Sequence, residues 1–581
     1  MQNELRQRWI MTALGLAAGL VIHALTEIMD RDLVGDRTGL GLLVLALTFF
    51  AGILAMTGPM GLRRALPAAA AIALAAAGLL AWGAGRFDAV ADYLGTGLPV
   101  LSGAVLAFVP IPFAIAAAGR GWRHYPTLFT ESWDAVVRYA AAAIFVGIVW
   151  AVIMLSDMLL QIVGLTVIGD LLDVEAVPYA ITGAALGLGM GVVTELADLI
   201  SPDLFLRLLR LLLPVVLLVM GVFLVALPMR GLSGLFGTLS ATATLLTIAG
   251  VAATLVTTAI AQSAEDAAES PVLRTSARIM ALILPVFTAL AVWGIWLRVA
   301  DYGWTPDRVL AAVIAALGLG YGLVYGIAAA LGGPWMARIR QGNLAMALVV
   351  TAGAALILTP LLDPQAISAR SQMARLDAGR ITPDAFDFAA LRRWGRAGKA
   401  AHDALVARAA EPGNEALAAA MNAVGQPVDE AVHLRTILSG TEVLPAARAA
   451  EAETVLAALD LSAKAQFSET CADRGADGKP VCMLAFADFR PDLPGDEALF
   501  LAHWPGRSGS LIGLVRDASG WRPADVHSTG PATGKDDPFA PRIGSDEVAA
   551  MIASLRQGLP APEPAPLNRL KLGEWGLMLL P

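Results

Sequence analysis

Separate runs of apolar residues, each long enough to cross a bilayer, constrain this chain more than any other feature of its sequence. A helix crosses the hydrocarbon core in about 20 predominantly apolar residues, so each run predicts one spanning helix. The eleven predicted spans lie at 9–29, 39–58, 67–85, 98–118, 138–164, 179–199, 206–229, 243–262, 279–299, 309–331 and 343–362. The predicted fold is an α-helical polytopic membrane bundle.

The charged residues divide the chain into two parts. Only 15% of the 581 residues are charged, whereas a soluble domain has about 25%. The first 363 residues use arginine alone, and every lysine comes later, at Lys399, Lys464, Lys479, Lys535 and Lys571. We therefore predict a transmembrane bundle over 1–363 in contact with the lipid bilayer, followed by a water-exposed part. The net charge of -8 gives no reason to expect nucleic acid.

Arginines in the short loops predict the orientation of the bundle, because cytoplasmic loops carry the excess of Arg and Lys. Loop arginines on the side of the N-terminus include Arg64, Arg138, Arg210, Arg274, Arg278, Arg338 and Arg340, and fewer lie on the opposite side. The N-terminus is therefore expected in the cytoplasm. An odd number of spans then places the C-terminal part outside. The first run has no small-x-small cleavage site and is expected to remain as a span.

The polar C-terminal part changes its pattern along the chain. Residues 364–461 show helical spacing, as a juxtamembrane or periplasmic helical region. The pattern predicts a small β-meander followed by a helix over residues 462–560, and a Pro-rich tail over residues 561–581. Together these features predict a soluble α+β domain behind the bundle.

The only two cysteines, Cys471 and Cys482, flank a segment rich in turn formers. We interpret AKAQFSETC and VCMLAFADF as two strands of a hairpin that brings the sulfurs together as a disulfide. Such a bond persists only in an oxidising compartment, which agrees with a periplasmic domain. The alternative is two unpaired thiols in a cytosolic domain. A metal site is weaker, since no second Cys or His pair accompanies them.

Ionisable residues inside the apolar runs are candidates for an intramembrane site. His23 and Glu27 share one face of the first span, Asp157 lies in the fifth, and Glu195 and Asp198 lie in the sixth. A proton relay would bring His23, Glu27 and Asp157 to one depth. The alternative is that these groups are hydrated near the interface or paired with arginines. They are too few to define a metal site, and no cofactor is expected.

Helix packing and helix breaks give two further hypotheses. The runs 184–193 and 315–324 are similar and glycine-rich, which indicates either a parallel internal repeat or simply close helix packing. Pro110 and Pro112 are expected to break the fourth span beside a cavity.

Two features of the C-terminal part suggest chemistry only weakly. Asp488, Asp492, Asp496 and Glu497 offer oxygen ligands for calcium, but their spacing is not that of an EF-hand. Ser508 and Ser510 lack the glycine spacing of a nucleophile elbow.

Two segments resemble the bacterial family called domain of unknown function 4153, whose members are multi-spanning membrane proteins with a polar C-terminal extension. LRVADYGWTPDRVL precedes the tenth span, and ISARSQMARLDAGRITPDAFDFAALR follows the last one. The matching positions include Arg298, Tyr302, Gly303, Thr305, Pro306, Arg308, Ser368, Gln372 and Arg375. The resemblance implies an inner-membrane location and no particular activity. We expect the loop to dock on the juxtamembrane helix through Tyr302 and the arginines, the alternative being two independent interface anchors.

Three functional hypotheses follow from the sequence. The first is an envelope structural or recognition protein that presents a periplasmic domain to an envelope protein or lipid partner. The second is a transporter or lipid-handling permease that uses the intramembrane His and carboxylate residues. A membrane-embedded enzyme has the least support, since no nucleophile and base are paired by any motif.

Overall fold

The computed structural model describes the chain except for residues 1, 196–201, 237–240, 426–429, 476–477, 491–494, 504–508, 518–519, 525, 530–544, 561–569, 573–574 and 580–581. The chain forms two compact units, residues 1–421 and 422–581. The first unit holds the apolar helices, and the second holds a five-stranded sheet. The predicted membrane bundle and the soluble α+β domain are both confirmed.

Eleven helical segments of the described chain are long and apolar enough to cross a membrane, which agrees with the predicted number. They are formed by α1 (Gln2–Asp30), α2 (Asp36–Met60), α3 (Leu62–Ala84), α5 with α6 (Leu98–Phe108 and Pro110–Ala118), α7 (Tyr125–Ile162), α9 (Ala176–Glu195), α10 with α11 (Pro202–Leu211 and Leu213–Phe236), α12 (Ala241–Ile260), α13 (Pro271–Tyr302), α14 (Pro306–Ala330) and α15 (Trp335–Leu356). The short helices α4 (Val90–Gly95) and α8 (Val167–Leu172) lie between spans.

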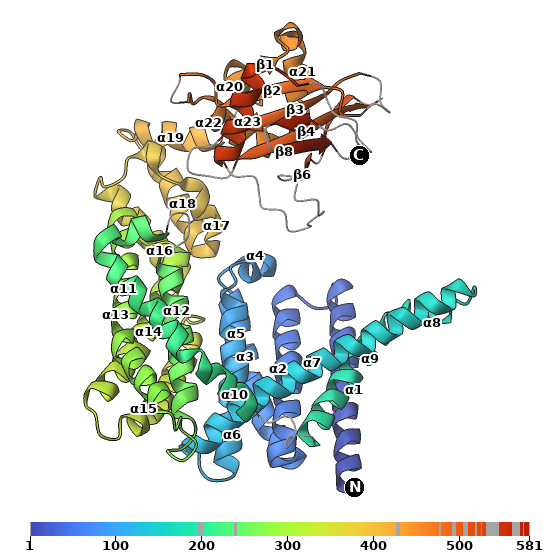
Figure 1. Ribbon diagram of the computed structural model, residues 1–581, viewed down its shortest axis with the longest axis vertical. Helices are drawn as coiled ribbons and strands as arrows, with labels where there is room; N and C mark the ends of the chain where they lie inside the picture. Colours follow the sequence, from blue (N-terminus) through green and yellow to red (C-terminus); the bar gives the residue numbers. More distant parts are fainter. Residues whose placement is uncertain are drawn as a thin grey trace. The chain divides into compact units, whose positions relative to one another are not determined.

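The polar helices that follow the last span belong to the same unit as the bundle up to Met421. They are η1 (Pro360–Leu362), α16 (Pro364–Asp377), η2 (Pro383–Ala385), α17 (Phe388–Arg393), α18 (Gly395–Ala409) and α19 (Glu415–Gly425). Asp363 caps α16, because its carboxylate accepts hydrogen bonds from the backbone of Gln365 and Ala366. Figure 1 shows α16 to α18 in yellow and orange beyond the last spans.

Helices α1 and α9 pack with their backbones in contact. A Cβ atom added at Gly183 would lie 2.2 Å from the carbonyl oxygen of Gly15, and one added at Gly187 would lie 2.2 Å from that of Met11. Only glycine permits this approach. The glycine-rich run 184–193 therefore has a packing role on α9, while the similar run 315–324 lies on α14.

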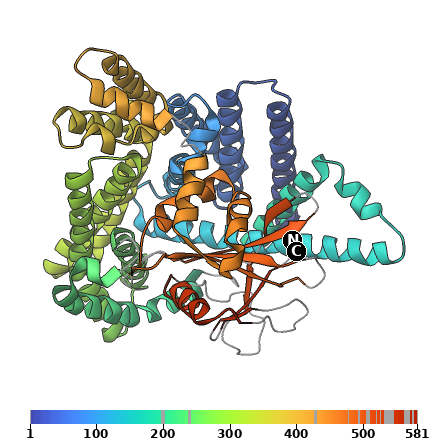
Figure 2. The ribbon, with the colours of Figure 1, turned by 90° about the horizontal axis from the view of Figure 1, so that it is seen from above.

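Helix α7 is longer than its predicted span and runs obliquely to the blue helices in both views (Figures 1 and 2). The sequence predicted its start near residue 138, but the helix begins at Tyr125, where the His124 side chain caps it. Its 38 residues correspond to about 57 Å. Arg138, counted above among the loop arginines, consequently lies on the helix, where it pairs with Glu131 and Asp134.

Arginine side chains close the ends of helices in the bundle. Arg340 donates to the carbonyls of Ile260, Ala261 and Ser263 at the end of α12. In the same way, Arg210 donates to Thr258, Arg278 to Ala329, Arg338 to Gly332, Arg274 to Ala268 and Arg64 to Ala118. Ala268 and Gly332 lie in loops, and the other contacts satisfy carbonyls at or just after the ends of helices.

The second unit is built on a sheet with the strand order β1-β2-β3-β4-β5. These strands are Thr441–Leu444, Cys482–Ala487, Glu497–Ala502, Ser510–Asp517 and Gly520–Ala524. Strands β2 to β5 form the predicted antiparallel meander, whereas β1 pairs with β2 in parallel. Strand β1 was missed, because its partner lies some 40 residues away in the sequence.

Helices cover both faces of this sheet, as Figure 2 shows. Leu484, Phe486 and Phe500 pack on one face against α20 (Glu430–Ser439), α21 (Ala452–Leu456) and α22 (Leu461–Cys471). The 3-10 helix η3 (Ala446–Glu451) lies between β1 and α21 in the chain. Met483 and Leu501 pack on the other face against α23 (Ser545–Gln557). Because both faces are covered, every residue of β2 and β3 is buried.

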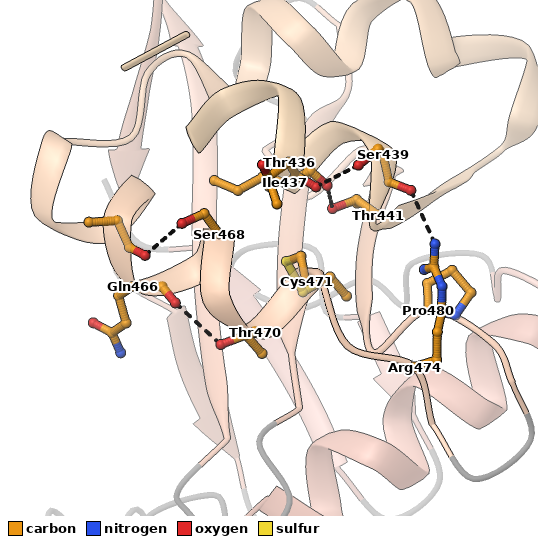
Figure 3. Close-up of a disulfide and its surroundings, with 12 residues drawn as sticks. Thr436, Ile437, Ser439, Thr441, Gln466, Ser468, Thr470, Cys471, Arg474 and Pro480 are labelled. Carbon is orange, nitrogen blue, oxygen red and sulfur yellow. Dashed lines mark hydrogen bonds between the residues drawn. A yellow bond between two sulfur atoms is a disulfide. The ribbon is translucent and has the colours of Figure 1, made fainter. Parts of the chain in front are cut away.

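The two cysteines form the predicted disulfide, but the hairpin expected around them is wrong. AKAQFSETC lies in helix α22, which Asp460 caps, so the bond joins the end of a helix to the first residue of β2 (Figure 3). The Cα atoms are 5.4 Å apart, and both residues are fully buried. The segment between them closes through a bridge from Arg474 to Pro480.

The last strands of the chain form a separate small sheet. Strands β6 (Val526–Thr529), β7 (Leu570–Leu572) and β8 (Trp575–Leu579) pair in the order β6-β8-β7. Both pairings are antiparallel. Within the predicted Pro-rich tail, Leu570–Leu572 and Trp575–Leu579 are therefore paired strands.

Candidate functional site

The fourth span is interrupted at Val109, between α5 and α6. Pro110 and Pro112 have no N–H group and cannot continue the ladder of hydrogen bonds, which accounts for the interruption. Phe108, Val109 and Pro112 face a cavity at this point. A proline-broken span therefore borders a cavity, as the sequence suggested.

This intramembrane cavity has a volume of about 990 Å³, at the upper end of the roughly 300–1,000 Å³ typical of ligand sites. Helices α12 to α15 form one wall, and α5, α6 and the first half of α7 form the other. The apolar lining includes Phe108, Phe113, Leu128, Phe129, Val136, Leu246, Ala249, Ala253, Leu284, Ile314, Leu344 and Ala347. None of the described residues that line it is an acid, a lysine, an arginine or a histidine.

A chain of hydrogen-bonded side chains lies at one end of the cavity. The Asn343 amide nitrogen donates to the Tyr125 hydroxyl at 3.0 Å, and the Tyr325 hydroxyl donates to the Asn343 amide oxygen at 2.6 Å. The Thr257 hydroxyl lies 2.7 Å from the Tyr325 hydroxyl. Four helices, α7, α12, α14 and α15, thus contribute one polar group each.

The position of this chain makes the cavity amphipathic. Tyr125 is the first residue of α7, and Thr257 lies in the last turn of α12. Leu246 lines the cavity eleven residues before Thr257 on α12, which corresponds to about 16 Å. One end is therefore polar, and an apolar passage extends from it into the bundle.

The two walls contact each other on both sides of the cavity. Near the polar end, Thr130 on α7 donates to Gln262, just after α12, at 2.6 Å. Beyond the other end, Leu98 and Leu106 of α5 pack in one cluster with Ala354 of α15. Near them Arg86, which follows α3, pairs with Asp363 at 3.3 Å and donates to the Thr359 carbonyl at 2.7 Å. There, burial raises the pKa of the neighbouring Tyr93 hydroxyl to about 12, with the nearby Arg86 opposing this shift.

The intramembrane residues predicted from the sequence are engaged with local partners. His23 stacks near Tyr179 of α9, Glu27 pairs with Arg31 on its own helix, and Asp157 accepts a hydrogen bond from Gln161 at 2.7 Å. None of the three lines the cavity. Glu195 is the last residue of α9, and Asp198 lies outside the described residues.

The structure brings the two family motifs together at the junction of bundle and juxtamembrane helix. The Gln372 amide on α16 donates to the carbonyls of Tyr302 and Trp304 at 3.0 and 2.9 Å. Arg375, one turn later, donates to the carbonyls of Ala300 and Asp301 at the end of α13. The loop thus docks on α16 through an arginine, as expected, while Tyr302 contributes its backbone carbonyl and not its ring. The Trp304 N–H also donates to the Ser371 hydroxyl at 3.1 Å.

The remaining motif residues support this junction. Thr305 caps α14, Pro306 is its first residue, and Arg308 donates to the Gly303 carbonyl at 2.7 Å while it stacks over the Tyr302 ring. The buried Ser368 hydroxyl donates to the Pro364 carbonyl within α16. Arg298 is exposed on α13.

Two of the carboxylates considered for calcium, Glu497 and Asp496, bind partners within the protein. Glu497 is buried and accepts hydrogen bonds from the backbone of Phe489 and Arg490, both at 2.9 Å. Burial is the main cause that raises the pKa of Glu497. Asp496 pairs with Arg448 at 2.8 Å. Asp492 and Ser508 lie outside the described residues, and Ser510 begins β4.

The sequence reasoning missed the polar end of the cavity. One available signal was Asn343, a lone amide in the eleventh span, and another was the pair Tyr321 and Tyr325 on one face of the tenth. The pairing of Asn343 with Tyr125 could not be found in this way, because 218 residues separate them.

Comparison with known proteins gives a family match. The family model described as Domain of unknown function (DUF4153) matches residues 39–405, which include the cavity and both motifs. No curated protein and no solved structure matches the chain.

Proposed function

We propose that this chain, which belongs to the family described as domain of unknown function 4153, is a lipid-handling membrane protein that binds an amphiphile in its intramembrane cavity. The observation that carries the proposal is the distribution of polarity within the cavity. An apolar passage leads to a single polar end, which matches a molecule with one head group and an apolar chain. Of the two main hypotheses, this geometry favours the lipid-handling permease over the envelope recognition protein.

The residues that carry this function differ from those suggested by the sequence. The lining has no carboxylate among the described residues, so the cavity offers no path for an ion or proton along charged groups. His23, Glu27 and Asp157 are assigned to local packing and pairing. The ligand is bound by burial of its chain and by hydrogen bonds to its head group.

The proposed location is the inner membrane, with the N-terminus in the cytoplasm and the C-terminal unit in the periplasm. The arginine distribution and the odd number of spans support this orientation. The buried disulfide in the C-terminal unit gives separate support, because such bonds persist in an oxidising compartment. In this topology the polar end of the cavity is near the cytoplasmic leaflet. The bound head group would then have the same depth as those of the lipids around it.

A matched pair of glycine substitutions tests the function. Gly250 lines the cavity, whereas Gly147 lies on α7 outside it, and a Cβ atom added at either position meets no atom within 4 Å. Gly250→Leu fills the cavity and is expected to remove tightly held lipid from the purified protein, as counted by native mass spectrometry. Gly147→Leu and the wild type are expected to retain it.

Thermal unfolding of the three proteins shows whether they are equally folded. Equal lipid occupancy in all three folded proteins would contradict the proposed function.

A further inference from the structure

The hydrogen bonds at the polar end leave specific protons free for a ligand. Each hydroxyl has only one proton. Tyr325 donates its proton to the Asn343 amide oxygen, and the Thr257 hydroxyl, 2.7 Å from the Tyr325 hydroxyl, donates to the Ala253 carbonyl at 2.9 Å, so neither proton is free. Tyr125 accepts from Asn343, and its own proton has no acceptor among the described residues. The chain therefore ends in a free hydroxyl donor on the cavity wall.

Two more donors line the cavity without a partner among the described residues. They are the hydroxyl of Tyr321, whose ring stands edge-on to that of Tyr325, and the indole N–H of Trp133. The other hydroxyls of the lining are occupied: Ser132, Thr254, Thr288 and Tyr139 donate to backbone carbonyls. Unpaired polar groups in an apolar cavity favour a ligand that supplies the missing acceptors.

No cationic side chain is available in the cavity to pair with a negatively charged ligand. Arg340 lies one turn before Asn343 on α15 and close to Tyr125, but its guanidinium donates to three carbonyls at the end of α12. The lining itself contains no Lys, Arg or His among the described residues. A buried anion without a cation carries a large desolvation cost, so a phosphate or carboxylate head group is disfavoured.

We infer that the ligand of the cavity is an uncharged lipid whose head group presents hydroxyl or carbonyl oxygens to Tyr125 and Tyr321. This inference rests on the proposed function and adds the chemical class of the ligand. Ester-linked and hydroxyl-bearing neutral lipids fit it. Phospholipids with a net negative charge do not.

Two lipids with the same acyl chains and different head groups test the inference. Dioleoylglycerol is neutral, and dioleoylphosphatidate carries a phosphate in place of its free hydroxyl. Each is titrated into the delipidated, full-length protein, and bound molecules are counted by native mass spectrometry. Dioleoylglycerol is expected to bind, and dioleoylphosphatidate at least about tenfold more weakly.

Substitution of the two tyrosines tests whether their hydroxyls bind the head group of the lipid. Tyr321→Phe removes one free donor and is expected to weaken dioleoylglycerol binding by about twofold to tenfold. Tyr125→Phe is expected to weaken it to a similar extent. Tyr179→Phe removes a hydroxyl outside the cavity and serves as the control.

The outcomes separate the inference from the proposed function. Equal or tighter binding of dioleoylphosphatidate would overturn the neutral head group while the lipid-binding function stands. Unchanged binding in both Tyr→Phe variants would overturn the assignment to Tyr125 and Tyr321. If neither lipid binds and the purified wild type also holds no lipid, the proposed function itself fails.

Discussion

Gly303 determines how closely the loop before α14 approaches α16. Its φ of +73° is in the left-handed region, and an added Cβ atom would lie 2.5 Å from Cδ of Arg375. The close approach allows Gln372 to reach the Tyr302 carbonyl and Arg375 to reach the Asp301 carbonyl, both at the end of α13. Because Gly303 has no side chain, four hydrogen bonds can form between the two motifs.

Gly303→Ala is expected to destabilise the protein more than Gly379→Ala. Both glycines have a positive φ, so each substitution carries a backbone cost, roughly 1–3 kcal/mol for a residue held in such a region. Gly303 also has a ψ of 179°, a conformation adopted almost only by glycine. Only at Gly303 does the new methyl group meet a neighbour, since nothing lies within 4 Å at Gly379. Thermal unfolding of the purified variants measures the difference. Equal shifts in the two variants would show that the contact with Arg375 contributes nothing.

At the scale of residues, the sequence revealed motifs but not their partners. The residues of the two motifs could be named in advance, because they form recognisable segments. The acceptors of Gln372 and Arg375 are backbone carbonyls, and a carbonyl has no signature in a sequence. The same limit applies to Arg340, whose partners are three carbonyls nearly 80 residues away.

At the scale of elements, long apolar helices were predictable and short amphipathic ones were not. A spanning helix repeats its apolar signal over about 20 residues. Helix α22 has only 11 residues, and its buried face includes the polar side chains Lys464 and Ser468. The apolar residues of α22 alone therefore do not show helical spacing, although Asp460 at its start is a typical helix cap.

The disulfide between α22 and β2 predicts how the two thiols react. The chain has no other cysteine, so a thiol reagent reports on this bond alone. The denatured, unreduced protein is expected to label at neither position, and reduction is expected to expose both. Cys471→Ser should lower the stability of the C-terminal unit by about 3 kcal/mol, because the bond closes a short loop. Labelling without prior reduction would contradict the oxidised state.

At the scale of the whole molecule, the number of spans and the side of the C-terminal unit are linked. With a cytoplasmic N-terminus, eleven spans lead to a periplasmic C-terminus. A C-terminal alkaline phosphatase fusion is therefore expected to be active, and a C-terminal fluorescent protein exported by the same route is expected to be dark. The opposite pair of results would overturn the proposed topology.

The arginines that close helix ends have a consequence for how the chain reaches this arrangement. In the proposed topology, Arg64, Arg210, Arg274, Arg278, Arg338 and Arg340 all belong to the cytoplasmic side, where positive charge orients a nascent chain. In the folded bundle Arg64, Arg210, Arg278 and Arg340 donate to carbonyls at the ends of other helices, whereas Arg274 and Arg338 donate to the loop before their own helix. A lysine would keep the orienting charge but lacks the planar fork of donors. The absence of lysine from the first 363 residues is thus consistent with side chains that first direct insertion and then lock the inserted helices together.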